Sequence, residues 1–148
     1  FLMRLRIGYP DAASEKQILR SSGFDQTRSI KAVLSAEDVL HLHQLVSQVA
    51  VEEALLDYML VIVEKTRRHE SLSLGVSPRG AQALYRATQA LALLEGRDYA
   101  IPDDVKRLAV PLFAHRVVMS SRLALSQRTA EASERLLQEI LTSTEVPL

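Results

Sequence analysis

The sequence predicts an all-α protein, a bundle of about five to six helices preceded by one short N-terminal strand. Apolar residues recur at helical spacing through most of the 148 residues, often just after a Ser, Asp or Pro that can begin a helix. Hydrophobic residues make up 47% of the chain, yet aromatics are only 5% and Trp is absent, so the core must be aliphatic. This length suits a single domain that buries about two thirds of its unfolded surface.

The charge balance and the absence of cysteine restrict the partners and the compartment. Lys plus Arg (18) equal Asp plus Glu (18), so no net positive field attracts nucleic acid or an anionic membrane, and neither is expected as a partner. The longest apolar run, residues 55–63, is interrupted by Asp57 and is too short to span a bilayer. A chain without Cys suits a reducing compartment, which predicts a cytoplasmic location. Because Phe1 opens without a Met or a leader, a fragment is expected.

The first 34 residues are predicted to hold a strand, a short helix and a loop. Residues 1–7 alternate with the two-residue period of a strand, which has no partner strand in the sequence. After a turn, Asp11 is a suitable N-cap for a helix to about Ser22, ended by Gly23. Residues 24–34 show no period and are expected to form a surface loop.

Two helices are predicted in the middle of the chain. Residues 35–38 resemble a capping box. The helix behind it carries one apolar stripe, formed by Val39, Leu42, Leu45, Val46 and Val49. The next helix, 52–69, is apolar nearly all round through its middle and is expected to be the central, most buried element.

Three further helices are predicted towards the C-terminus. After a turn at 73–75, Ser77 caps a helix with Pro78 at its first position, and Gly96 ends it shortly after Leu94. Its expected buried stripe is Ala81, Leu84, Thr88, Leu91 and Leu94.

Another helix begins near Pro102 and should be kinked or ended early by Pro111. Its inward side chains are expected to be Val105, Leu108, Ala109 and Leu112. A polar connector over 117–128 leads to an amphipathic helix, 131–141. We expect this last helix to pack on the others rather than to reach a neighbouring subunit.

Several kinds of catalytic site are excluded by what the sequence lacks. His41 and His43 are two residues apart and lie on different helix faces, and no Cys accompanies them, so no metal site is predicted. No G-x-S-x-G elbow is present to expose a serine nucleophile. No G-x-x-x-x-G-K-[ST] loop is present to cradle phosphates, so this chain alone is not expected to hydrolyse ATP.

Arg79 is the strongest candidate for a functional residue. It stands in the first turn of the helix that follows Gly75-Val76-Ser77-Pro78, where a side chain leans towards the N-terminal end. A guanidinium in that place can grip a phosphate group. The alternative is an ordinary exposed arginine at the start of a helix.

Four blocks, in order, resemble the C-terminal portion of MoxR-type AAA+ ATPases, and the resemblance covers about residues 1–118. They are Phe1-Leu2-Met3-Arg4-Leu5-Arg6-Ile7-Gly8-Tyr9-Pro10, Leu34-Ser35-Ala36-Glu37-Asp38-Val39, Gly75-Val76-Ser77-Pro78-Arg79-Gly80-Ala81 and Gly96-Arg97-Asp98-Tyr99-Ala100-Ile101-Pro102-Asp103-Asp104-Val105-Lys106.

The resemblance implies the helical lid that follows an ATPase core. Residues 1–10 would be the end of the core and the junction, 11–118 the lid, and 119–148 a connector and C-terminal helix. The resemblance makes Arg79 the sensor 2 arginine that contacts the γ-phosphate, acting in cis or in trans, and the arginine finger would lie just before Phe1. The nucleotide-binding residues it implies are Tyr9, Pro10, Ser77, Pro78 and Arg79.

For the whole protein, the resemblance implies an ATPase that uses ATP and Mg and has a chaperone-like role in maturing other proteins. Its partners would be the missing core, neighbouring subunits of a homo-oligomeric, hexameric ring, and a von Willebrand factor A-type protein. No nucleotide is expected on this fragment. The lid would rotate on residues 8–10 when the γ-phosphate leaves.

Two residues depart from similar sequences. Gly80 should soften the start of its helix, and Ile101 is a weaker helix cap than Thr or Ser.

Two alternative functions remain at this point. The helices 78–94 and 102–115 could form a helix-turn-helix pair that contacts DNA through Lys106, Arg107 and Arg116, although the connector is longer than usual. The chain could also be a structural interaction domain in which Arg79 is ordinary surface.

Overall fold

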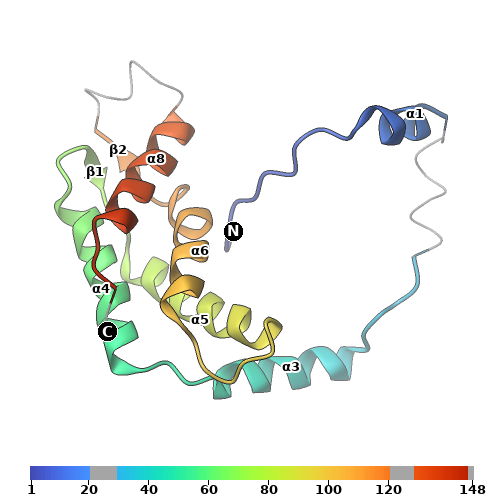
Figure 1. Cartoon of the computed structure of the whole chain (residues 1–148), viewed down its shortest axis with the longest axis horizontal. Helices are drawn as coiled ribbons and strands as arrows, with labels where there is room; N and C mark the ends of the chain where they lie inside the picture. Colours follow the sequence, from blue (N-terminus) through green and yellow to red (C-terminus); the bar gives the residue numbers. More distant parts are fainter. Residues whose placement is uncertain (21–29, 121–128, 147–148) are drawn as a thin grey trace. The chain divides into compact units, whose positions relative to one another are not determined.

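The fold is mainly helical, as predicted, and adds a small two-stranded sheet. The structure is a computed structural model that describes residues 1–20, 30–120 and 129–146. Within these residues the chain forms six helices and two short strands (Figure 1). The elements are α1 (Ala12–Arg20), α3 (Ala36–Gln48), α4 (Glu53–Arg68), β1 (Leu72–Leu74), α5 (Pro78–Leu94), α6 (Pro102–Phe113), β2 (Val118–Met119) and α8 (Thr129–Thr142).

The chain divides into two compact units, and the smaller one is Leu5–Leu42. It holds α1 and the start of α3. Each helix begins at a predicted cap. Asp11 Oδ1 accepts the Ser14 N–H at 2.7 Å, and Ser35 Oγ accepts the Asp38 N–H at 3.1 Å. The predicted end of the first helix at Ser22 and Gly23 lies outside the described residues, as does most of the loop predicted over 24–34.

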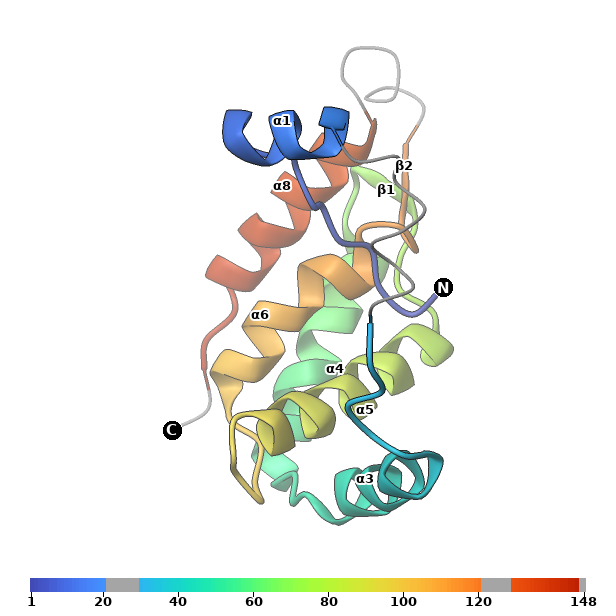
Figure 2. The same ribbon diagram turned by 90° about the vertical axis from the view of Figure 1, so that its right-hand side faces the viewer.

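The larger unit, Phe1–Arg4 together with His43–Leu148, is a helical bundle with an aliphatic core. In Figure 2, α6 lies between α5 and α8, and α4 packs against all three of these helices. The largest fully buried apolar side chains come from α4, α5, α6, α8 and the loop before α5: Ile62, Val63, Val76, Leu84, Val105, Leu112, Phe113 and Leu137. The C-terminal helix therefore packs on the bundle, as expected.

The sheet was not predicted. β1 and β2 pair antiparallel, with Leu72 opposite Met119 and Leu74 opposite Val118. The local sequence predicts instead a turn at 73–75 and a polar connector from residue 117. Strands of three and two residues are too short to show a period, so only the pairing of distant segments reveals them. The remainder of that connector, 121–128, lies outside the described residues.

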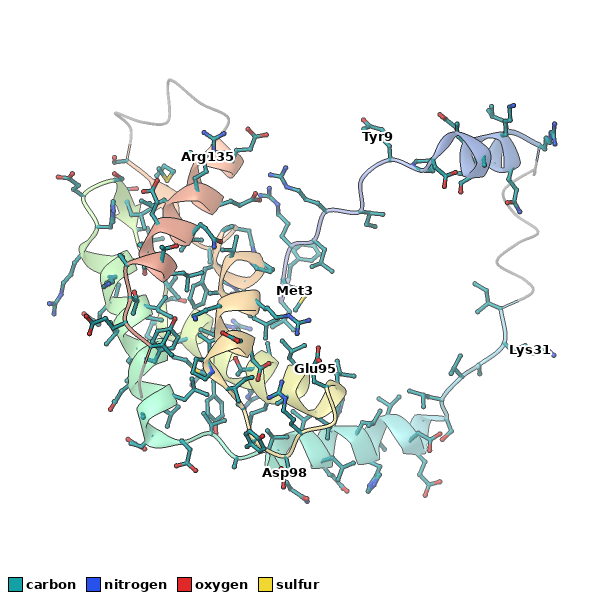
Figure 3. The ribbon with its side chains drawn as sticks, viewed as in Figure 1. Met3, Tyr9, Lys31, Glu95, Asp98 and Arg135 are labelled. Atoms are coloured by element: carbon teal, nitrogen blue, oxygen red, sulfur yellow. The ribbon has the colours of Figure 1, made fainter. Side chains whose placement is uncertain are left out.

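The strand predicted over 1–7 is absent from the structure. Instead, Arg4 donates its N–H to the Pro111 carbonyl at 2.9 Å and its guanidinium to Glu134 at 3.2 Å, while Met3 packs against the core (Figure 3). Alternating residues form a strand only where a neighbouring edge supplies hydrogen bonds. Here the partner is the Pro111 carbonyl, which lies in the last turn of α6 and accepts a hydrogen bond from the segment.

Four details of burial and helix ends differ from the predictions. Leu94, the last residue of α5, is 82% exposed although it was expected in the buried stripe. In α4, Leu60 and Val61 are exposed at 53% and 46%, so that helix is buried on one side and not all round. Only Val49 of the stripe predicted for α3 is buried. Pro111 does not end α6, since the helix runs on to Phe113.

The loop between α5 and α6 is organised by one buried ion pair. Gly96 ends α5 with a φ of 75°, as predicted. Arg97 then donates to both carboxylate oxygens of Asp104, at 2.7 and 2.9 Å. Asp104 also accepts the Ile101 N–H at 3.0 Å, so an acidic side chain three residues on compensates for the poor cap at Ile101. This loop also contacts the segment that connects α3 to α4, because the Ala50 N–H donates a hydrogen bond to the Asp98 carbonyl at 2.8 Å.

The ion pair predicts a loss of stability in acid. Burial raises the pKa of Asp104, but the hydrogen bonds from Arg97 and from the Ile101 N–H outweigh it and hold the pKa below its ordinary value. A lowered pKa in the folded state stabilises the fold at pH values above the ordinary carboxyl pKa of about 4, and this contribution is lost as the pH falls through the lowered value. Urea unfolding of the wild type and of Asp104→Asn should therefore show a stability difference that shrinks below about pH 4. A constant difference down to about pH 2 would contradict this linkage.

Candidate functional site

The start of α5 follows from its local sequence. Ser77 has an extended backbone, and its Oγ accepts the Gly80 N–H at 3.2 Å. Pro78 occupies the first helical position, where a missing N–H costs no hydrogen bond. The predicted N-cap and first turn are therefore confirmed. Arg79 is the second residue of the helix and is exposed.

The loop before α5 is fixed to the end of α4. Val76 is buried, and its N–H donates to Thr66 Oγ1 at 3.0 Å. Its carbonyl accepts a hydrogen bond from Arg67 Nε at 2.9 Å. A Cβ on Gly75 would lie 2.6 Å from the Arg67 Cα and 2.7 Å from the Arg67 N, so only glycine allows this approach. The helix that carries Arg79 therefore starts from a rigid support.

Arg79 opens onto a hollow of about 540 Å³. The hollow is lined by Phe1, Leu2, Arg79, Ala83 and Arg116, all of which belong to the larger unit. No carboxylate among the described residues forms an ion pair with Arg79. An unpaired guanidinium facing an open hollow is available to an oxyanion.

Arg116 reaches the same hollow from the turn after α6. Its Nε donates to the Leu112 carbonyl at 2.9 Å, and its Nη2 donates to the carbonyls of Phe1 and Leu2 at 2.8 and 3.1 Å. The side chain is half-buried. Three hydrogen bonds to carbonyls hold the guanidinium in one place without neutralising its charge.

Gly80 packs closely against the loop before α5. It is buried, and a Cβ there would lie 2.7 Å from Val76 Cγ1 and 3.6 Å from Arg116 Cδ. From the sequence, Gly80 is only a departure that weakens the helix. The structure explains the glycine by packing, because the Cβ of any larger residue would overlap with the buried side chain of Val76.

Three of the site residues that the sequence predicts lie in the larger unit. Ser77, Pro78 and Arg79 are consecutive at the start of α5. Tyr9 and Pro10 belong to the smaller unit, where both side chains are exposed. Sequence reasoning named Arg116 only as a possible DNA contact and missed its place in the hollow. No local pattern could have found it, because Arg116 is 37 positions from Arg79 in the sequence.

The basic residues that supported a DNA-binding alternative have other partners. Lys106 pairs with Asp103 at 3.4 Å, and Arg107 pairs with Glu95 at 2.8 Å. Arg116 is bound to backbone carbonyls, as described above. The structure therefore gives little support to a row of free cations along α6.

Other features of the described residues offer no better site. A larger hollow of about 760 Å³ between α4 and α8 contains Lys65 and Arg68, but Lys65 binds the Ser143 carbonyl at 2.7 Å and Arg68 pairs with Glu64 at 3.3 Å. Within the residues that the structure places, no cluster of three His, Asp or Glu could hold a metal ion. None of the helices described is long and apolar enough to cross a membrane.

The comparisons with known proteins agree with this architecture. The family model of the AAA lid domain matches residues 64–140, which are just over half of the chain. The uncharacterized protein YeaC of Bacillus subtilis is 38% identical over 149 residues, covering 100% of this chain and 46% of YeaC. Chaperone MoxR1 of Mycobacterium tuberculosis is 33% identical over 129 residues, covering 81% of this chain and 34% of MoxR1.

A solved structure shows the same fold. The crystal structure of a candidate ATPase from Cytophaga hutchinsonii superposes with a TM-score of 0.84 at 24% identity, covering 100% of this chain and 47% of that one. The chain thus spans less than half the length of the relatives it matches. It belongs to the AAA lid domain family and is related to the MoxR-family AAA+ ATPases.

Proposed function

We propose that this chain is the lid of a longer MoxR-type AAA+ ATPase, in which Arg79 senses the terminal phosphate of bound ATP. The observation that carries the proposal is the exposed, unpaired guanidinium of Arg79 on a rigidly supported helix start, facing a hollow. The family supports it too, because the domain accompanies an ATPase core. The parts that bind Mg and split ATP would lie in that core, and the lid contributes no such group.

In this proposal, Arg79 converts the loss of a phosphate into movement. While the γ-phosphate is present, a charge-assisted hydrogen bond holds the lid closed. Once the phosphate leaves, Arg79 has no anionic partner among the described residues, and the closed state loses its advantage. Coupling of this kind is typically about 1–3 kcal/mol, enough to shift the population by about 5-fold to 150-fold. The joint would be residues 8–10, where Gly8 has a φ of 77°, favoured by glycine alone.

The proposal also assigns a purpose to the movement. One relative is a chaperone by name. We therefore assign the longer protein a chaperone-like role in maturing or assembling other proteins, as a hexameric ring in the cytoplasm, with von Willebrand factor A-type partners. Light scattering of the longer protein with and without ATP would test the ring.

Replacing Arg79 with Gln in the longer protein should reduce ATP hydrolysis at least ten-fold. The physical reason is the loss of a cation that meets the terminal phosphate, whereas stability should hardly change because Arg79 is exposed and unpaired. Steady-state hydrolysis and thermal unfolding measure the two effects. Arg86→Gln is the matched control, since Arg86 is another exposed arginine of the same helix and lies outside this hollow. Hydrolysis at the normal rate by Arg79→Gln would disprove the sensor role.

A further inference from the structure

Two arginines from distant parts of the sequence line the hollow at the start of α5. Arg79 comes from the first turn of α5, and Arg116 comes from the turn after α6. The other lining residues, Phe1, Leu2 and Ala83, carry no charged side chain. The two positive charges therefore share a hollow to which no lining side chain contributes a negative charge.

These arginines differ from most others in the larger unit. Arg67 and Arg68 pair with Glu64, Arg97 with Asp104, and Arg107 with Glu95. Arg79 and Arg116 pair with no carboxylate in the described part of the chain. Two cations placed together without an anion repel each other, so an arriving oxyanion gains from both.

Arg116 is oriented in advance for such a ligand. Its Nε and Nη2 are bound to the carbonyls of Leu112, Phe1 and Leu2, which leaves Nη1 without a partner among the described residues. The aliphatic part of the Arg116 side chain lies beside Gly80, and Gly80 is the residue that follows Arg79 in the sequence. A guanidinium that is already immobilised loses little side-chain entropy when it binds.

We propose that Arg116 is a second phosphate-binding residue of the site that contains Arg79, and that the two together bind the terminal phosphate of a nucleoside triphosphate. This inference rests on the proposed function and deepens it. Arg79 is the exposed group that can follow the ligand, and Arg116 is the fixed group that defines where the phosphate sits. A diphosphate lacks the group that both bind, so both arginines contribute to the preference for the triphosphate.

The test measures the affinity of the longer protein for ATPγS and for ADP by isothermal titration. Arg79→Gln and Arg116→Gln should each lower the ratio of ATPγS affinity to ADP affinity about ten-fold, which is the effect of removing one charge-assisted contact. Arg86→Gln controls for net charge. Arg4→Gln controls for loosening of residues 1–4, because it removes the ion pair with Glu134 without touching the hollow. Both controls should keep the ratio within about two-fold of the wild type.

The outcomes separate this proposal from the sensor role of Arg79. A lower ratio for Arg79→Gln with an unchanged ratio for Arg116→Gln overturns the second residue and leaves the sensor. The reverse result, a lower ratio for Arg116→Gln alone, overturns both the sensor role of Arg79 and the joint binding of the phosphate by the two arginines. If neither variant changes the ratio, both proposals are wrong. If Arg116→Gln weakens both nucleotides equally, and Arg4→Gln does the same, Arg116 only anchors the N-terminal segment and the proposal is overturned.

A second variant covers the case in which Arg116→Gln does not fold. Arg116→Lys keeps the charge but replaces the planar fork with a single ammonium group. The ratio should fall about three-fold, less than for the loss of the charge, with thermal unfolding close to that of the wild type. A ratio equal to that of the wild type would overturn the proposal.

Discussion

Replacing Asp104 with Ala should lower the free energy of unfolding by about 3 kcal/mol. Asp104 is 1% exposed and accepts three hydrogen bonds, two from Arg97 and one from the Ile101 N–H. Breaking a buried ion pair by removing one partner typically costs about 3–5 kcal/mol, and the lower end applies because the Arg97 side chain keeps 21% of its surface in water. Urea unfolding at about pH 7, where the carboxylate is charged, would measure the loss.

The neighbouring residue provides the matched control. Asp103 stands in the same first turn of α6 but is exposed and pairs only loosely with Lys106, at 3.4 Å. Asp103→Ala should therefore unfold at nearly the same urea concentration as the wild type. Asp104→Asn keeps one acceptor oxygen and should fall between the two. Equal stabilities of Asp103→Ala and Asp104→Ala would show that the buried pair does not hold the loop.

Replacing Gly75 with Ala should destabilise the fold by about 3 kcal/mol and displace the loop that carries Arg79. The new Cβ would lie 2.6 Å from the Arg67 Cα and 2.7 Å from the Thr66 carbonyl carbon. Both are backbone atoms of α4, so no side-chain rotation relieves the overlap, and the cost lies at the upper end of that for overpacking, about 1–3 kcal/mol. Thermal and urea unfolding would measure it.

Gly96 separates this steric effect from the ordinary cost of replacing a glycine. Gly96 has a φ of 75°, and no atom lies within 4 Å of the position that a Cβ would take. Gly96→Ala should therefore lower the free energy of unfolding by about 1 kcal/mol, through backbone strain alone. Gly75→Ala should be clearly less stable than Gly96→Ala. In the longer protein it should also lower ATP hydrolysis, because the start of α5 shifts. A Gly75→Ala variant as stable as Gly96→Ala would contradict the close approach.

The parts of the fold that sequence reasoning found depend on nearby residues. The helix starts predicted at Asp11, Ser35 and Ser77 are confirmed, because a cap and the N–H group it binds lie within three positions of each other. The start at Pro102 is confirmed as well, because proline favours the first helical position. The stop at Gly96 is confirmed too, because glycine readily takes the positive φ that ends a helix. Arg79 could be singled out because it follows a recognisable cap and proline.

The predictions that failed depend on distant residues. An alternating segment at 1–7 predicts a strand, but whether it pairs with a sheet or with the end of α6 is decided by what lies beside it. Leu60 and Leu94 are apolar residues of predicted helices, yet both are exposed, because burial depends on which parts of a helix other elements cover. The β1–β2 pairing joins segments separated by more than 40 residues.

The helical class, most helix starts and the candidate Arg79 could be derived from the order of the residues, because propensities, caps and apolar periods act over one or two turns. The folded chain was needed to show that Arg116 lies in the same hollow as Arg79, that Gly75 and Gly80 are required by close packing, and that Arg97 and Asp104 close the loop between α5 and α6. These are contacts across helices, and their geometry is fixed by how the buried faces pack against one another rather than by any local pattern.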